Sequence, residues 1–99
     1  MQNNVEPTII EFDVYSSWHK QPPAYRVYVD NELMTERTFL AQEYEFYREQ
    51  VFVMLEPGTH SFEFEKLPTK SNEDKLSIKN FKINQKAYTL VENQFTLPV

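Results

Sequence analysis

Carboxylates are the side chains in this sequence with the spacing that acid–base chemistry needs. Glu11 and Asp13, like Glu63 and Glu65, are two residues apart in stretches where apolar and polar side chains alternate. On a strand, such a pair projects from one face with the carboxyls about 7 Å apart, within the range that glycosidases use. An outward face is well hydrated, so nothing there raises one pKa as a general acid requires. The favoured interpretation is that these carboxylates are solvated charges or cross-strand partners for Lys79 and Lys82.

Nucleophilic, metal and cofactor chemistry find little support. His60 precedes Ser61, but neighbours on a strand point to opposite faces and cannot act as base and nucleophile together. His60 is instead interpreted as a turn residue that is hydrogen-bonded to the backbone. The two histidines are 41 residues apart, cysteine is absent, and there is no Walker loop, dinucleotide fingerprint or HExxH motif. The sequence therefore predicts a protein that is not an enzyme and needs no cofactor.

A proline-flanked loop, S-S-W-H-K-Q-P-P at residues 16–23, carries the only tryptophan. Sugar sites place aromatic faces against the apolar side of a pyranose ring. Trp18, with Tyr15 and Tyr25 or Tyr28 as helpers, is therefore a candidate glycan platform. The alternative is that Trp18 closes one end of the fold.

Apolar side chains outnumber the positions that a small two-layer core offers. After the inward positions of the predicted strands are filled, several large side chains remain, and some of them can pack under loops. If others share an outer sheet face, they form a patch of the kind that marks protein interfaces, with arginines at its rim. The predicted interface residues are Arg37, Phe39, Phe46, Tyr47, Phe52 and Met54.

Charge argues against nucleic acid or an anionic membrane as the main partner, because the formal net charge is −5. The charge is uneven: residues 1–65 carry 12 acids and 4 bases, whereas residues 66–99 carry 3 acids and 6 bases. The six lysines of residues 66–86 either pair with the acidic half of the chain or form a basic docking patch. No signal peptide or membrane span is visible, so we expect cytoplasmic synthesis without secretion.

Period-two alternation predicts strands at residues 8–15, 25–30, 33–40 and 75–83, and short final strands at 87–91 and 94–99. The strand at 75–83 changes face partway, which a bulge near Lys79 and Asn80 would explain. Turns are expected at residues 30–32 and 84–85, a surface loop at 67–74, and a loop or irregular strand at 40–50.

A central hairpin is predicted at residues 51–65, with the only glycine in its turn, Glu56-Pro57-Gly58-Thr59. The incoming arm, V-F-V-M-L, is apolar throughout, which predicts that both of its faces are covered, the second by a loop or by another molecule. With few helix signals, the fold class is all-β: one domain over residues 1–99, an antiparallel β-sandwich of jelly-roll type with about eight strands.

The segments P-A-Y-R-V-Y-V-D-N-E-L, V-F-V-M-L-E-P-G-T-H-S-F-E-F and E-D-K-L-S-I-K-N-F-K-I-N resemble the small jelly-roll, calcium-dependent carbohydrate-binding modules of the xylan-binding kind. The resemblance covers about residues 9–84. It implies a calcium site at Glu65, Asn72, Glu73 and Asp74. The family usually has an Asn-Asp pair where this chain has Glu65-Lys66, which places an ammonium where a hard cation wants oxygen.

The W-H-x-x-P-P loop and the E-R-T-F segment also look like parts of the small β-sandwich accessory proteins of large tailed phages. The leading hypothesis is a non-catalytic assembly or accessory protein that docks on a larger complex or on its own copies, such as a virion structural or decoration protein. The alternative is a carbohydrate-binding module, with or without calcium.

Overall fold

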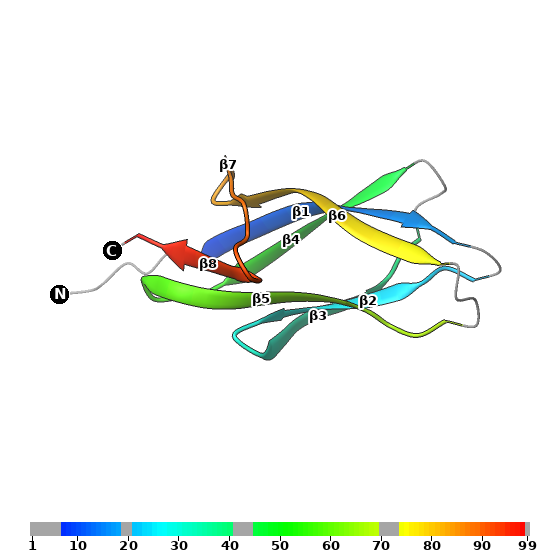
Figure 1. The fold of residues 1–99 in the computed structure, drawn as a ribbon, viewed down its shortest axis with the longest axis horizontal. Helices are drawn as coiled ribbons and strands as arrows, with labels where there is room; N and C mark the ends of the chain where they lie inside the picture. The colour runs from blue at the N-terminus through cyan, green and yellow to red at the C-terminus, as the bar shows by residue number, and fades with distance from the viewer. Residues whose placement is uncertain (1–6, 19–20, 41–44, 70–73, 99) are drawn as a thin grey trace.

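The computed structural model describes residues 7–18, 21–40, 45–69 and 74–98. These residues form eight strands and no helix, arranged in two antiparallel sheets of four strands that pack face to face (Figure 1). The predicted all-β sandwich is therefore confirmed. Within the described ranges no helix is long and apolar enough to cross a membrane. The strands are β1 (Thr8–Ser17), β2 (Ala24–Val29), β3 (Glu32–Thr38), β4 (Phe46–Val53), β5 (Gly58–Lys66), β6 (Lys75–Ile83), β7 (Lys86–Ala87) and β8 (Gln94–Leu97).

The strand order is β4-β1-β6-β7 in one sheet and β3-β2-β5-β8 in the other. All the strand pairs are antiparallel. This is the strand pairing of an eight-stranded jelly roll, except that the two strands that come first in that fold come last in this chain. The edge strands β3 and β4 are joined through residues 39–45, and β7 and β8 through residues 88–93, so each connection links the two sheets.

The stretch predicted as a central hairpin is instead a crossover between the sheets, so that prediction was wrong. β4 pairs with β1 over eight residue pairs, from Thr8↔Val53 to Tyr15↔Phe46, whereas β5 pairs with β2 and β8. The chain still reverses at Gly58, whose φ of +126° is one that L-residues rarely adopt. A tight turn can join two paired strands of one sheet or two strands of different sheets. Here the long pairing of β4 with β1 places β4 in the other sheet.

The core lies between the sheets and is built from the inward positions of both. Aromatic rings meet across the two layers: the centroid of Phe12 is 5.5 Å from that of Phe62 and 6.0 Å from that of Phe64, both edge-to-face. Such pairs add to the free energy gained from the area they bury. The buried apolar residues are Ile10, Phe12, Val14, Tyr25, Val27, Val29, Phe39, Val51, Phe62, Ile83, Phe95 and Leu97.

Three tight turns have positive φ at both loop residues, as type I′ turns require: Asp30-Asn31, Asn84-Gln85 and Glu92-Asn93. Each is flanked by a paired couple of residues. Asparagine and aspartate tolerate this conformation better than other non-glycine residues, because their short side chains hydrogen-bond locally. The first two turns were predicted from sequence, and the third separates β7 from β8.

The predicted bulge in β6 is confirmed. The β1–β6 register shifts between Glu11↔Lys82 and Asp13↔Lys79, and Asn80 has a φ of +56°. The extra residue returns the second half of the strand to the inner side. As a result, Leu76, Ile78, Phe81 and Ile83 all belong to the core or pack against it.

β4 was predicted as a loop or irregular strand over residues 40–50, but Phe46 begins a regular strand of eight residues. Its inward side chains include Glu49, a charged residue in a position where sequence reading expects an apolar one. The charge of Glu49 at this inward position hides the period-two alternation of apolar and polar residues. At the other end of the chain, β7 has two residues rather than the five predicted.

Candidate functional site

The outward side of the β4-β1-β6 sheet gathers most of the predicted interface residues that remain at the surface. Neighbours on a strand point to opposite sides, so alternation sets which side chains reach this surface. Phe52 lies opposite Ile9, and Phe46 lies opposite Tyr15. We call this surface the basic face. Its side chains are those of Ile9, Glu11, Asp13, Tyr15, Phe46, Arg48, Gln50, Phe52, Lys75, Ser77, Lys79 and Lys82.

Exposed apolar side chains lie at both ends of the β4 border of the basic face. At one end Phe52 is 61% exposed, and Met54, two residues further on, is 57% exposed. At the other end Phe46 is 45% exposed and its ring centroid is 5.5 Å from that of Tyr15. The expected cover over the outer side of residues 51–55 is therefore not supplied by the described part of the chain.

The other three predicted interface residues have roles within the fold. Phe39 was predicted to be at the surface but is buried in the core, and its backbone N–H donates to the carbonyl of Pro23 at 2.8 Å. Arg37 lies over the ring of Tyr47, with 4.6 Å from Cζ to the ring centroid. Of the six predicted residues, Phe46, Phe52 and Met54 thus present exposed apolar side chains.

Arg37 also reaches a buried carboxylate that the sequence did not reveal. The Glu49 side chain is 1% exposed, and the Arg37 Nε donates to both of its oxygens at 3.1 Å. The Tyr25 hydroxyl donates to Glu49 Oε1 at 3.4 Å, and burial raises the pKa of the Tyr25 phenol. An inward-pointing charge on an edge strand discourages sheet-to-sheet pairing with another molecule. Glu49 occupies such an inward position on the edge strand β4.

Asp13 forms a second charged network, in the middle of the basic face. The Arg48 Nε donates to Asp13 Oδ1 at 3.0 Å, and the Asn80 Nδ2 donates to Asp13 Oδ2 at 2.9 Å. Burial alone would raise the pKa of Asp13, but these hydrogen bonds outweigh it and leave the pKa below its usual value. A general acid needs the opposite shift. Asp13 is therefore a charged, structural residue, and Glu11 lies 4.0 Å from the Arg48 Nε.

His60 ties two chain turns together at one end of the β3-β2-β5-β8 sheet. Its Nδ1 lies 2.7 Å from Asp30 Oδ2 and its Nε2 lies 2.7 Å from the carbonyl oxygen of Glu56. Both partners are acceptors, so both ring nitrogens donate only when the imidazole is protonated. The bond to the Glu56 carbonyl and the one to Asp30 accordingly raise the pKa of His60. This agrees with the prediction of a turn residue bonded to the backbone.

The predicted glycan platform is not assembled from its four aromatic residues. Tyr25 is in the core, Tyr28 is on the outward side of the other sheet, and Trp18 is partly buried against the core. Tyr15 reaches the basic face, but Lys79 Nζ lies 4.8 Å from its ring centroid and Phe46 packs beside it. Trp18 packs against the core, as the alternative interpretation expects of it, and its role in closing one end of the fold stays a prediction.

The calcium ligands implied by resemblance are only partly placed, because Asn72 and Glu73 lie outside the described residues. Glu65 accepts a hydrogen bond from the Tyr28 hydroxyl at 3.4 Å and lies 3.9 Å from an Arg26 nitrogen. Asp74 is buried. Among the residues that the structure describes, no three His, Cys, Asp or Glu side chains are grouped as a metal site requires.

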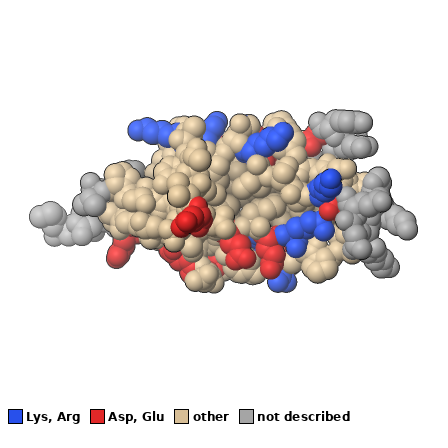
Figure 2. Space-filling model, viewed as in Figure 1, with Lys and Arg blue, Asp and Glu red and all other residues tan. Residues whose placement is uncertain are grey.

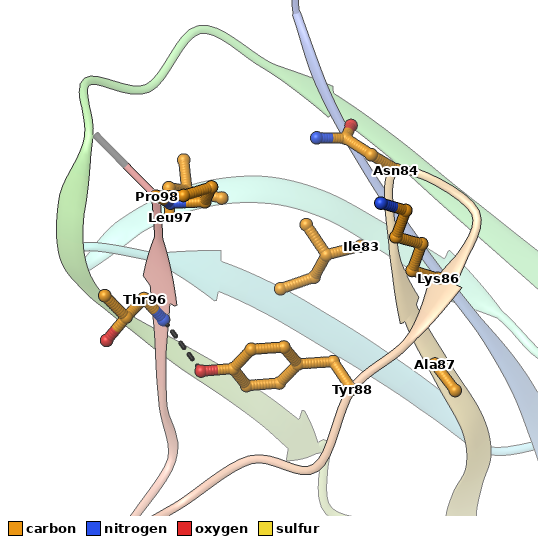
Figure 3. A pocket seen from close by; sticks show the side chains of 8 residues that line it. All are labelled: Ile83, Asn84, Lys86, Ala87, Tyr88, Thr96, Leu97 and Pro98. Atoms are coloured by element: carbon orange, nitrogen blue, oxygen red, sulfur yellow. Dashed lines mark hydrogen bonds between the residues drawn. The ribbon is translucent and has the colours of Figure 1, made fainter.

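A hollow of about 310 Å³ opens where the β6–β7 turn faces β8 (Figure 3). Its lining includes the buried Ile83 and Leu97 and also Tyr88, whose hydroxyl accepts a hydrogen bond from the backbone N–H of Thr96 at 2.9 Å. Among the described residues that line it, Lys86 is the one basic residue and none is a carboxylate. This described lining therefore lacks the paired groups that acid–base catalysis uses.

No protein-family model matches the sequence, and comparison with curated proteins and with solved structures found no match. Function is therefore inferred from the placement of the residues of the chain itself.

Proposed function

We propose that this protein is a non-catalytic assembly module that docks on a protein surface through its basic face. The observation that carries the proposal is that Phe52, on that face, and Met54, two residues further along the chain, are both exposed and neither belongs to the core. Isolated apolar residues at a surface are ordinary, but clustered ones border interaction sites. Ile9, opposite Phe52, extends the cluster onto β1.

The free energy available from covering these side chains is substantial. A phenylalanine offers roughly 200 Å² of surface, and burial contributes about 25 cal/mol per Å². Covering the exposed 61% of Phe52 would therefore contribute about 3 kcal/mol, and Met54 a similar amount. Two such anchors match the few residues that dominate measured interfaces.

The ionisable groups of the described residues also favour binding over catalysis. The carboxylates with catalytic spacing are paired with arginines or hydrated, and the pKa of Asp13 is lowered. His60 has both ring nitrogens engaged, which leaves neither free to take a proton from a substrate.

The test is a double substitution, Phe52→Ser with Met54→Ser, set against Gln50→Ser as a control. Gln50 is exposed on the same face between Arg48 and Phe52. Sedimentation and light scattering measure assembly, and mass spectrometry identifies proteins retained by the wild type. We expect the double variant to keep its thermal midpoint and to lose assembly or retained partners. A wild type that is monomeric and retains no protein would overturn the proposal.

The narrower hypothesis, a component of a phage particle, rests on the resemblance of two segments. In one of them, E-R-T-F, Arg37 and Phe39 have the intramolecular roles described above. Co-migration of the protein with intact particles in a density gradient, and its loss in the double variant, would support this hypothesis.

Sugar binding, which the other resemblance implies, is separated from protein docking by a glycan array with and without calcium. Specific retention that disappears in Trp18→Ala would support a carbohydrate-binding module. Retention of no glycan, together with a partner lost in the double variant, would support docking.

A further inference from the structure

The two outer surfaces of the sandwich carry opposite charge. The basic face has four basic side chains, those of Arg48, Lys75, Lys79 and Lys82, against Glu11 and Asp13. We call the outward side of the β3-β2-β5 sheet the acidic face. It carries Glu36, Glu63 and Glu65 against a single basic residue, Arg26. In Figure 2 most of the visible acidic side chains lie over this lower sheet, together with some basic ones toward the right, and the upper margin carries mainly basic ones.

Internal pairing leaves the excess charges available on both surfaces. On the basic face Arg48 lies within ion-pair distance of Asp13 and Glu11. The excess positive charge therefore comes from the three exposed or partly exposed lysines of β6. On the acidic face Arg26 is within ion-pair distance of Glu36 and Glu65. Glu63, opposite Tyr28 on the neighbouring strand, is exposed.

Each surface also offers apolar contact area. Phe52 and Met54 border the basic face. On the acidic face Leu33 is 50% exposed and lies opposite Tyr28. Charged rims around apolar contacts are the usual composition of a protein interface.

From this complementarity we propose that copies of the chain associate head to tail, with the basic face of one copy against the acidic face of the next. The inference rests on the proposed docking function and names its partner as a second copy. Two like faces would repel, so a symmetric face-to-face pair is disfavoured. Joining two different surfaces generates a ring or an open chain of copies rather than a closed dimer. Extension through the β4 edge is opposed by the inward Glu49.

Charge reversal on each surface tests the arrangement. Lys75→Glu with Lys79→Glu makes both surfaces acidic, and Glu63→Lys with Glu65→Lys makes both basic. Glu92→Lys, in the turn before β8, is the control, since it changes the net charge without altering any of the side chains that define the two surfaces. Sedimentation velocity over a concentration series, at about 0.05 M and 0.5 M salt, measures the association constant, because exposed charges are screened at high salt.

We expect the wild type and Glu92→Lys to associate at low salt and to dissociate at high salt. Each double variant alone should associate at least about tenfold more weakly. An equimolar mixture of the two double variants should recover association, since every contact then joins opposite charges. A wild type that stays monomeric, double variants that associate normally, or a mixture that does not recover would each overturn head-to-tail association. If instead the wild type is monomeric alone but binds another protein through Phe52 and Met54, docking stands and self-association falls.

Discussion

Removal of the Arg37 guanidinium should cost far more stability than its partly exposed position suggests. Arg37→Met keeps an unbranched side chain but loses both hydrogen bonds to Glu49 and the contact of the guanidinium with the Tyr47 ring. Among the described residues, Tyr25 is then the one remaining hydrogen-bond donor to the Glu49 carboxylate, at 3.4 Å, and that carboxylate is 1% exposed. Leaving one partner of a buried pair uncompensated costs roughly 3 to 5 kcal/mol. Arg37 is 40% exposed, so water can replace part of it, and we expect a loss of about 2 to 3 kcal/mol.

Glu49→Gln should cost less, about 1 kcal/mol, because a neutral amide oxygen still accepts a hydrogen bond and the freed Arg37 is partly hydrated. The variant that carries both Arg37→Met and Glu49→Gln should then be more stable than the sum of the two separate losses predicts. The difference, a coupling free energy of about 1 to 2 kcal/mol, measures the pair itself.

Urea unfolding followed by the fluorescence of Trp18, the only tryptophan, gives these values. With a denaturant slope of about 1 kcal/mol per M, the Arg37→Met midpoint should fall by about 2 M or more. Arg26→Met is the matched control, since its ion pair with Glu36 is exposed on both sides, and its midpoint should not move. Equal losses in Arg37→Met and Arg26→Met, or additive losses at Arg37 and Glu49, would refute the role assigned to the buried carboxylate.

Two further predictions follow from hydrogen bonds at turns and bulges. Because the pKa of His60 is raised in the folded state, its contribution to the free energy of unfolding is complete below the unfolded pKa of about 6.5 and is lost as pH rises through the folded pKa. Because the pKa of Asp30 is lowered, the contribution of Asp30 is lost at the acid end, as pH falls below about 4. The stability difference between wild type and His60→Phe should therefore be larger at about pH 5 than at about pH 9, and equal differences at the two pH values would contradict the double acceptor arrangement. At the bulge, Asn80→Ala should cost about 1 to 2 kcal/mol through strain at positive φ and the lost bond to Asp13, while Asn80→Gly should cost less because glycine adopts that φ freely. Thermal unfolding of the two variants compares them directly, and equal midpoints would assign the cost to the hydrogen bond alone.

Much of the fold can be predicted from local patterns in the sequence. The alternation around Phe12 and Val27 defines β1 and β2, and the change of parity in β6 predicts the bulge at Asn80, because the period of two is a property of the strand backbone itself. The turn at Asp30-Asn31 is similarly local, since it depends on residues that tolerate positive φ. For the candidate site, the excess of apolar residues over core positions predicted exposed side chains, and Phe52 and Met54 are exposed.

Tertiary structure decided which strands became partners and, through that, where several candidate residues lie. The segments on either side of Gly58 are each suited to a hairpin, and only the competing ladder with β1 sends β4 to the other sheet. The same placement turns Glu49 inward, where a charge is tolerated because Arg37 arrives from β3. Phe39 is buried in the core, and its backbone N–H donates to the carbonyl of Pro23, which is another contact between residues far apart in the sequence. Local sequence determines the shape and the two faces of a strand, but its neighbours depend on long-range pairings whose free energies are compared only when the whole chain has folded.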